Sequence, residues 1–154
     1  MSSKFKVQGL RFRVVAFYCL LLTAYCLLSC SIPNLENPQC RESQTTIKEF
    51  YSFHFGNDMK FSAENLRQRE RFLSADLVKS LQNASPDADV FTTNSTDYPK
   101  AFRIGKCEVE TNEKTVFEVL FFWKDDTRSE QRSIKVEVAK QNDKWLINKI
   151  NNRP

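Results

Sequence analysis

The sequence offers two side chains that could act as a catalytic base, His54 and Asp97. His54 is the only histidine of the chain, and imidazole is the side chain that most often moves protons near neutral pH. It falls on the apolar stripe of an expected helix, so a hydrogen-bonded core histidine is the competing interpretation. Asp97 stands directly before Tyr98 and Pro99, where a carboxylate commonly caps a turn. Each residue therefore has both a catalytic and a structural interpretation.

No pattern in the sequence predicts a metal ion or a cofactor. A zinc site needs three or four ligands, and one histidine with a cysteine pair supplies too few. Three glycines in the whole chain are too few for a glycine-rich phosphate loop. The Gly-x-Ser-x-Gly pattern of a nucleophile elbow does not occur either. We therefore expect neither a metal nor a cofactor.

The amino-terminal segment has the character of an export signal. An apolar run from Val14 to Leu28 follows a basic head, which consists of Lys4, Lys6, Arg11 and Arg13. The run is shorter than the roughly 20 residues that span a bilayer, which favours a cleaved signal peptide over a retained membrane anchor. It ends in Leu27-Leu28-Ser29-Cys30, which resembles the lipobox of bacterial lipoproteins. The resemblance implies cleavage before Cys30 and attachment of lipid to its sulfur.

The lipobox predicts a signal peptide (residues 1–29), a lipidated cysteine with a tether (30–41) and a single domain (42–154). Ser31 after the cysteine implies sorting to the outer membrane in enteric-type bacteria, with the domain facing the periplasm. Cleavage removes four of the 23 basic residues and none of the 19 acidic ones, which leaves a net charge of 19 − 19 = 0. A neutral domain gives no compositional support for nucleic-acid binding.

Cleavage would also leave three of the five cysteines. With Cys30 lipidated, Cys40 and Cys107 form an even pair in an oxidising compartment. A disulfide between them would close a long loop and contribute about 4 kcal/mol in the loop-entropy model. Two free buried thiols are the alternative, because a sequence does not give the distance between the two Cα atoms.

The apolar pattern changes from helical to strand-like part-way along the domain. We expect a helix over Glu42–Phe55, a second from about Ser62 and a third capped by Ser74. A long polar connection, Asn83–Tyr98, follows, and connections of this length are more often functional or mobile than idle. Four strands are then expected: Ala101–Glu110 with a bulge at Gly105-Lys106, Thr115–Lys124, Ser133–Ala139 and Lys144–Ile150, with a long hairpin loop over Asp125–Arg132. The order predicts an α+β domain, with N-terminal helices packed on an antiparallel β-meander.

The run Thr115–Trp123 is expected to be the central strand, because both of its faces are largely apolar. One face consists of Phe117, Val119, Phe121 and Trp123. The other face consists of Val116, Glu118, Leu120 and Phe122. We expect Glu118 to be solvated or to pair with Lys135 on the next strand. The apolar residues around it suggest a protein partner or a homodimer through this outer sheet face.

Three arginines alternate with Gln68 and Glu70 on the second expected helix, and they are Arg67, Arg69 and Arg71. A charge run of this kind is usually a solvated helix face. Contact with anionic lipid headgroups or the cell wall is the functional alternative.

Several short motifs resemble an uncharacterised domain family of bacterial lipoproteins over about residues 45–150. They are Phe50-Tyr51, Phe72-Leu73-Ser74, Asp97-Tyr98-Pro99, Phe102-Arg103-Ile104-Gly105 and Trp145-Leu146-Ile147. That family has the cone-shaped, nuclear-transport-factor-like (cystatin-like) fold, so the resemblance implies a curved sheet around a central space. Enzymes of this superfamily place an Asp or His in an apolar pocket there. The residues expected to line such a pocket are Tyr51, His54, Tyr98, Arg103, Phe121 and Trp123.

Three functions are compatible with these features. The leading hypothesis is a non-catalytic, lipid-anchored envelope protein that docks a protein partner or holds a small apolar ligand. The second is a small enzyme of the isomerase, dehydratase or hydrolase type, which would use His54 or Asp97 as its base. The third is an interaction protein, for instance one that neutralises a toxin. A shared fold does not decide among them, because one fold serves many activities.

Overall fold

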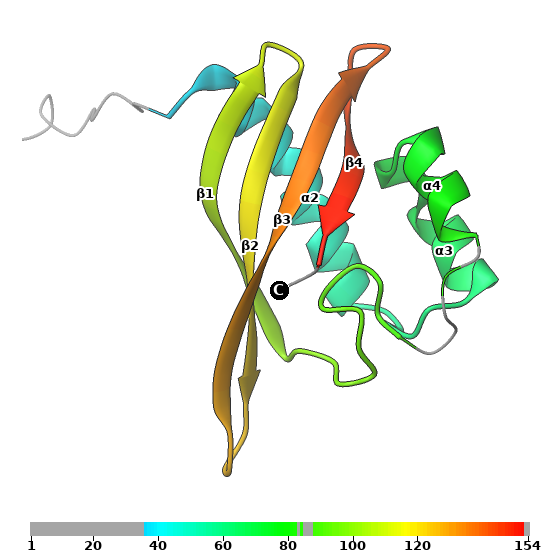
Figure 1. The fold of residues 1–154 in the computed structure, drawn as a ribbon, viewed down its shortest axis with the longest axis vertical. Coiled ribbons are helices and arrows are strands. Elements are labelled where there is room, and N and C mark those ends of the chain that lie inside the picture. Colours follow the sequence, from blue (N-terminus) through cyan, green and yellow to red (C-terminus); the bar gives the residue numbers. More distant parts are fainter. Residues whose placement is uncertain (1–35, 83, 85–87, 153–154) are drawn as a thin grey trace, which may run out of the picture. The chain divides into compact units, whose positions relative to one another are not determined.

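A computed structural model describes residues 36–82, 84 and 88–152 of the chain. Its helical elements are α2 (Pro38–Phe55), α3 (Ala63–Arg69), the 3-10 helix η1 (Glu70–Phe72) and α4 (Ala75–Leu81). The strands are β1 (Ala101–Thr111), β2 (Lys114–Lys124), β3 (Ser129–Gln141) and β4 (Lys144–Asn151). Three α-helices followed by four strands confirm the predicted α+β class (Figure 1).

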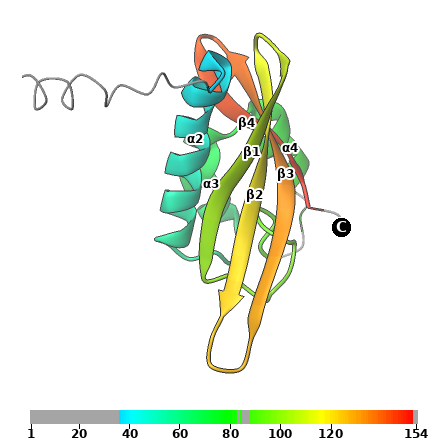
Figure 2. The ribbon, with the colours of Figure 1, turned by 90° about the vertical axis from the view of Figure 1, so that its left-hand side faces the viewer.

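The strands form one curved antiparallel sheet in the order β1-β2-β3-β4. Helix α2 packs across one face of this sheet, which we call the inner face, and the opposite face is the outer face (Figure 2). The segment from α3 to α4 lies beside β4. There Leu73 forms a parallel bridge with Ile147, and the N–H of Ser74 donates to the carbonyl of Ile147 at 2.9 Å.

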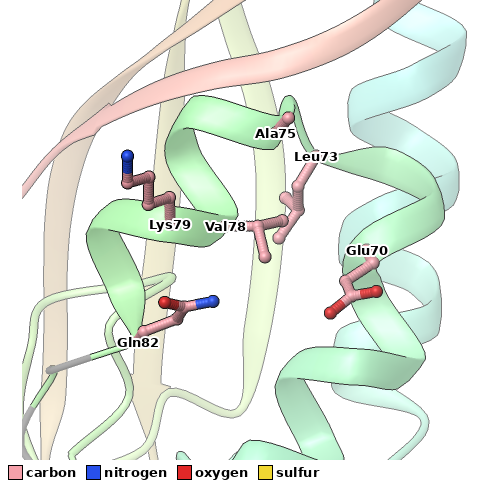
Figure 3. A pocket seen from close by; sticks show the side chains of 6 residues that line it. All are labelled: Glu70, Leu73, Ala75, Val78, Lys79 and Gln82. Carbon is pink, nitrogen blue, oxygen red and sulfur yellow. The ribbon is translucent and has the colours of Figure 1, made fainter.

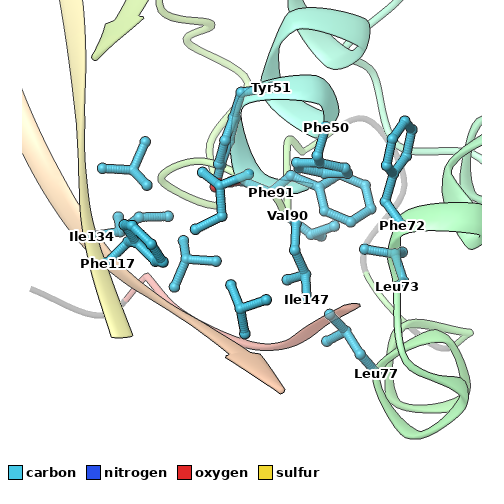
Figure 4. Packing of buried hydrophobic residues seen from close by; sticks show 14 of the residues in the cluster. Phe50, Tyr51, Phe72, Leu73, Leu77, Val90, Phe91, Phe117, Ile134 and Ile147 are labelled. Atoms are coloured by element: carbon cyan, nitrogen blue, oxygen red, sulfur yellow. The ribbon is translucent and has the colours of Figure 1, made fainter. Parts of the chain in front are cut away.

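The core lies between α2 and the inner face of the sheet (Figure 4). The prediction for β2 is confirmed, because Phe117, Val119 and Phe121 are all completely buried. They face the buried stripe of α2, which includes Ile47, Phe50 and Tyr51. Each large apolar side chain that leaves water in this way contributes about 1.5–3 kcal/mol to folding. The alternation of β2 and the stripe of α2 therefore specify how the two elements pack.

Helix α2 begins earlier than predicted. Residues 38–41 were expected to belong to a tether, but the helix starts at Pro38 and includes Cys40. The side chain of Asn37 caps this end by accepting a hydrogen bond from the N–H of Gln39 at 3.0 Å. Proline is well suited to the first helical position, because the N–H that it lacks would have no partner there. Asn-Pro in this chain thus marks a helix start rather than a linker.

The two shorter helices begin where the sequence predicts. The hydroxyl of Ser62 accepts a hydrogen bond from the N–H of Asn65 at 3.1 Å. The hydroxyl of Ser74 does the same for the N–H of Leu77 at 3.2 Å, at the start of α4. These bonds satisfy amide groups that have no partner within their own helices.

The hairpin between β2 and β3 is longer than predicted, and its loop is shorter. The expected loop over residues 125–132 contracts to four residues, because β3 already begins at Ser129. Asp125 closes the turn, since its carboxylate accepts hydrogen bonds from the N–H groups of Thr127 and Arg128. The predicted bulge in β1 is confirmed by a register shift between Ile104 and Cys107.

The disulfide between Cys40 and Cys107 is confirmed, with a Cα–Cα distance of 6.0 Å. It joins the first turn of α2 to the middle of β1. The bond therefore fastens the beginning of the helix to an edge strand of the sheet.

Candidate functional site

The histidine that sequence analysis singled out lies at the centre of a buried polar network. His54 has no solvent exposure. Its Nε2 lies 3.1 and 3.0 Å from the two carboxylate oxygens of Asp89. On the other side of the ring, Nδ1 accepts a hydrogen bond from Nε of Arg69 at 2.9 Å. Because Nδ1 is an acceptor, the ring proton is assigned to Nε2, which donates to the carboxylate.

Arg69, from the last turn of α3, supplies the positive charge of the network. Its other two nitrogens donate to the carbonyls of Asn65 and Asp58, both at 2.7 Å. Burial lowers the pKa of the guanidinium, and the nearby charge of Asp89 works in the opposite direction. Arginine nonetheless stays ionised in proteins. The prediction that Arg69 lies on a solvated helix face is wrong, since its side chain is only 1% exposed. It turns inward and donates to His54, which in turn contacts the buried carboxylate of Asp89.

Asp89 provides the negative charge, and the chain folds around its carboxylate. One oxygen accepts from the N–H of Phe91 at 3.0 Å, and the other accepts from the hydroxyl of Thr92 at 2.7 Å. The backbone of Asp89 pairs with Ser95, and a tight turn through Asn94, with φ of 53°, closes the loop. Part of the connection that was expected to be polar is therefore a compact turn, in which Val90 and Phe91 enter the core.

This arrangement makes the network a structural element and not a reactive centre in this conformation. The side chains of His54 and Asp89 are 0% exposed. A general base must come within about 3 Å of the proton that it removes, and no substrate atom can reach that distance here. Among the described residues, the one buried side-chain polar atom that lacks a hydrogen bond is Oγ1 of Thr93, outside the network. The network instead joins α2, α3 and the loop at Asp89.

Tyr51 extends the network through the same loop, since its hydroxyl donates to the carbonyl of Phe91 at 2.9 Å. Burial, and secondarily the charge of Asp89, raise the pKa of Tyr51 well above its usual value. The folded state thus keeps this phenol neutral at a pH where the unfolded chain ionises it. The resulting stabilisation is complete below about pH 10 and is lost as pH rises above that value.

We expect the unfolding free energy of Tyr51→Phe to depend less on alkaline pH than that of the wild type. At pH 8 the variant should be less stable by about 1 kcal/mol, because one buried hydrogen bond is lost. Above pH 10 this difference should shrink by up to about 1.4 kcal/mol per pH unit. Urea unfolding of both proteins at pH 8, 10 and 11 measures this difference in unfolding free energy. A constant difference between the two proteins across this range would contradict the assignment.

Asp97, the second candidate base, belongs to a different cluster. Its carboxylate pairs with Arg128 at 2.8 Å, and its carbonyl accepts from the indole nitrogen of Trp123 at 3.1 Å. The guanidinium carbons of Arg128 and Arg132 lie 5.5 and 5.0 Å from the centre of the Trp123 ring. Asp97 therefore anchors the loop before β1 to the long hairpin, and it shares no partner with His54.

The residues predicted to line one pocket are distributed over the core and both sheet faces. Tyr51, His54 and Phe121 are fully buried, Trp123 is 3% exposed and Tyr98 is half-buried. Ring contacts at 5.5 Å join Tyr51 to Phe102 and to Phe121. Arg103 projects from the outer face, with its guanidinium carbon 5.9 Å from the centre of the Phe122 ring. Aromatic rings therefore occupy the space between α2 and the sheet.

A shallow hollow of about 550 Å³ lies between η1 and α4 (Figure 3). Its lining combines apolar and charged residues, which are Glu70, Leu73, Ala75, Val78, Lys79 and Gln82. Sites for small ligands usually enclose most of the ligand surface. This hollow is open to solvent, so its shape is better suited to receive a protruding side chain.

The outer face of the sheet is less open than the sequence suggested. Leu120 is only 7% exposed, and Val116 and Phe122 are half-buried. Leu120 lies over Gly105, where a Cβ atom would come within 2.7 Å of its side chain. Glu118 does lie opposite Lys135 in the strand register, as predicted. Long charged side chains such as that of Lys135 can cover apolar neighbours with their methylene groups. The outer face therefore gives less support to the predicted homodimer than the sequence suggested.

The remaining predictions concern residues or ligands that this structure does not test. Cys30 and the signal peptide lie outside the described residues. In the part of the chain that is described, no helix has the length and apolar character needed to cross a membrane. The same residues contain no group of three or more potential ligands positioned to hold a metal ion.

No family model matches this sequence, and no curated protein matches it.

Asp89 is the site residue that sequence analysis missed. Its partners are 35 and 3 residues away in the sequence, and the segment around it is polar with several aspartates. One signal was present, since Asp89-Val90-Phe91-Thr92 places two large apolar residues inside an otherwise polar connection. Apolar residues in such a place indicate a segment that packs against the core.

Proposed function

We propose that this protein is a lipid-anchored module of the bacterial cell envelope that acts by docking a protein partner and not by catalysis. The observation that carries the proposal is the state of His54, the single histidine of the chain. It is sealed between an acid and an arginine with both ring nitrogens engaged. An interior occupied by aromatic rings likewise supports docking at the surface over a ligand held inside.

The anchored state would give the domain a defined orientation. Glu36, the first described residue, lies only six positions after Cys30, a separation that can span at most about 20 Å. The first turn of α2, the β1–β2 turn and the β3–β4 turn lie at the same end of the domain (Figure 1). A lipid on Cys30 would hold this end near the bilayer. The long β2–β3 hairpin, which carries Trp123 and its arginines, would then point away from the membrane.

The disulfide supports the proposed compartment. A structural disulfide between two partly or fully buried cysteines persists in oxidising environments such as the periplasm. Ser31 favours the outer membrane as the site of anchoring, with the domain in the periplasm. A toxin-neutralising protein is one form that such a docking module would take.

We predict that Cys30→Ala abolishes fatty-acid labelling and cleavage of the signal, and that Cys26→Ala leaves both unchanged. The two cysteines are four residues apart in the same segment, so the second variant controls for the loss of a thiol there. Labelling with a fatty-acid analogue, followed by mass spectrometry of the amino-terminal peptide, measures both effects. An unmodified Cys30 thiol in the wild type would refute the anchor.

Native mass spectrometry of the same detergent-purified protein tests the docking half of the proposal. The expected mass is that of the processed, lipidated chain, or a whole multiple of it, with no small molecule bound. A small molecule that stays bound through purification would contradict docking and favour ligand binding. This outcome is independent of lipidation, so the two halves of the proposal can fail separately.

A further inference from the structure

The outward edge of β1 is an unpaired backbone surface in the described part of the chain. β1 is an eleven-residue edge strand whose ladder hydrogen bonds go to β2. No other backbone hydrogen bond to residues 101–111 occurs among the described residues. Seven of its residues are exposed, including Val109, the only large apolar side chain in the described chain with that degree of exposure. A long edge of this kind can pair with another strand.

The opposite edge of the sheet, β4, is partly covered by another segment of the chain. In the segment that connects η1 to α4, Leu73 forms a bridge to Ile147 of β4, and the N–H of Ser74 donates a hydrogen bond to the Ile147 carbonyl. The chain thus covers part of one sheet edge with its own backbone. β1 has no corresponding cover from the described residues.

The charges along this edge are sorted by sign. Positive residues occupy its first half and negative residues its second half, in the order Lys100, Arg103, Lys106, Glu108, Glu110 and Glu113. At the change of sign, Lys106 and Glu108 form an ion pair within the chain, with Nζ and Oε1 2.8 Å apart. The pair is exposed, with 74% of Lys106 and 54% of Glu108 accessible, so that either side chain can exchange its partner for one on another copy. A strand with this order is complementary to a second copy of itself that runs in the opposite direction. Parallel pairing would set like charges against each other, which is unfavourable.

We propose that two copies of this chain pair through their β1 edges, antiparallel and about a two-fold axis near Cys107. The two sheets would join into one sheet of eight strands, four from each copy. In this register Lys106 of one copy lies opposite Glu108 of the other, and Arg103 lies near Glu110. Two-fold symmetry makes each of these contacts twice. The surface differs from the outer sheet face, and the proposal does not depend on lipidation.

The bulge at Gly105-Lys106 and the lysine within it are also devices that keep edge strands from pairing indiscriminately. In this strand, the bulge and the order of charges allow only a few registers of pairing, because a shift of one copy along the other brings like charges together. The arrangement would therefore favour a defined dimer over open-ended aggregation.

Two charge-reversed variants test this directly. Arg103→Glu/Lys106→Glu makes all four charged residues within β1 acidic, and Glu108→Lys/Glu110→Lys makes all four basic. The full chain is purified in detergent, and its association is measured by sedimentation over a concentration series. We expect a dimer for the wild type and dimerisation weakened by roughly tenfold or more for each variant alone. An equimolar mixture of the two variants should recover a heterodimer, which also shows that both are folded.

Lys48→Glu/Lys79→Glu is the matched control. It reverses the same number of positive charges at exposed positions on α2 and α4, and it should leave the dimer unchanged. A wild type that stays monomeric at the highest concentration would overturn the proposal. A mixture of the acidic and basic variants that fails to associate would overturn it as well.

Discussion

Replacing Asp89 by alanine should destabilise the protein by about 3–5 kcal/mol, which is the usual loss when a buried charge is left without its counter-charge. The substitution would leave the guanidinium of Arg69 buried without its counter-charge. It would also remove the acceptor for His54 Nε2, for the N–H of Phe91 and for the hydroxyl of Thr92. Because whole domains are stable by only about 5–15 kcal/mol, this loss could exhaust much of the total.

Urea unfolding of the full chain measures this effect, and Asp97→Ala is the matched control. Both changes remove an aspartate near an arginine. Asp89 is buried and reaches Arg69 through His54, whereas Asp97 is 45% exposed in its direct pair with Arg128. Exposed ion pairs contribute little, so the control should lose far less stability. Equal losses for the two variants would show that burial of the network is not what makes Asp89 important.

A double substitution tests whether the two buried charges, which His54 bridges, depend on each other. Arg69→Met alone should also be strongly destabilising, because it leaves the carboxylate of Asp89 without its positive charge. Arg69→Met combined with Asp89→Ala should cost clearly less than the sum of the two, since neither charge is then left alone. Additive losses would mean that Arg69 and Asp89 stabilise the fold independently.

The parts of the fold that follow from local patterns could be predicted from the sequence. The alternation Phe117, Val119, Phe121 identified the buried face of β2, and the stripe through Ile47 and Phe50 identified that of α2. Periodicity of this kind depends only on neighbouring residues. The cysteine pair was also predictable, because only Cys40 and Cys107 remain to pair once the predicted signal peptide and the predicted lipidated cysteine are set aside.

The buried network could not be predicted, because its partners come from three distant segments. Arg69 has the same sequence context as Arg67, which is exposed, and only the packing of α3 against α2 turns one inward. Asp89 stands in a polar segment, and nothing in its immediate neighbourhood shows that its carboxylate is buried. His54 was located correctly on the helix stripe, and its partners, which decide between catalysis and structure, became visible only in the folded chain.

Loss of the disulfide should have the second large effect. Cys40→Ala/Cys107→Ala is expected to reduce stability by about 2–5 kcal/mol, the usual range for a native disulfide in a small secreted domain. The bond closes a loop with a sequence separation of 67 residues, so much of the effect comes from the greater freedom of the unfolded chain. It also holds the first turn of α2, where the proposed lipid anchor would pull on the domain.

Wild-type protein treated with a reductant should therefore unfold at the same urea concentration as the double alanine variant, and the reductant should not affect the variant further. Protease cleavage near Cys40 should increase in both, because the start of α2 would no longer be tied to β1. If the reductant left the wild type as stable as before, the bond would contribute nothing measurable, and α2 would be held by its packed inner stripe alone.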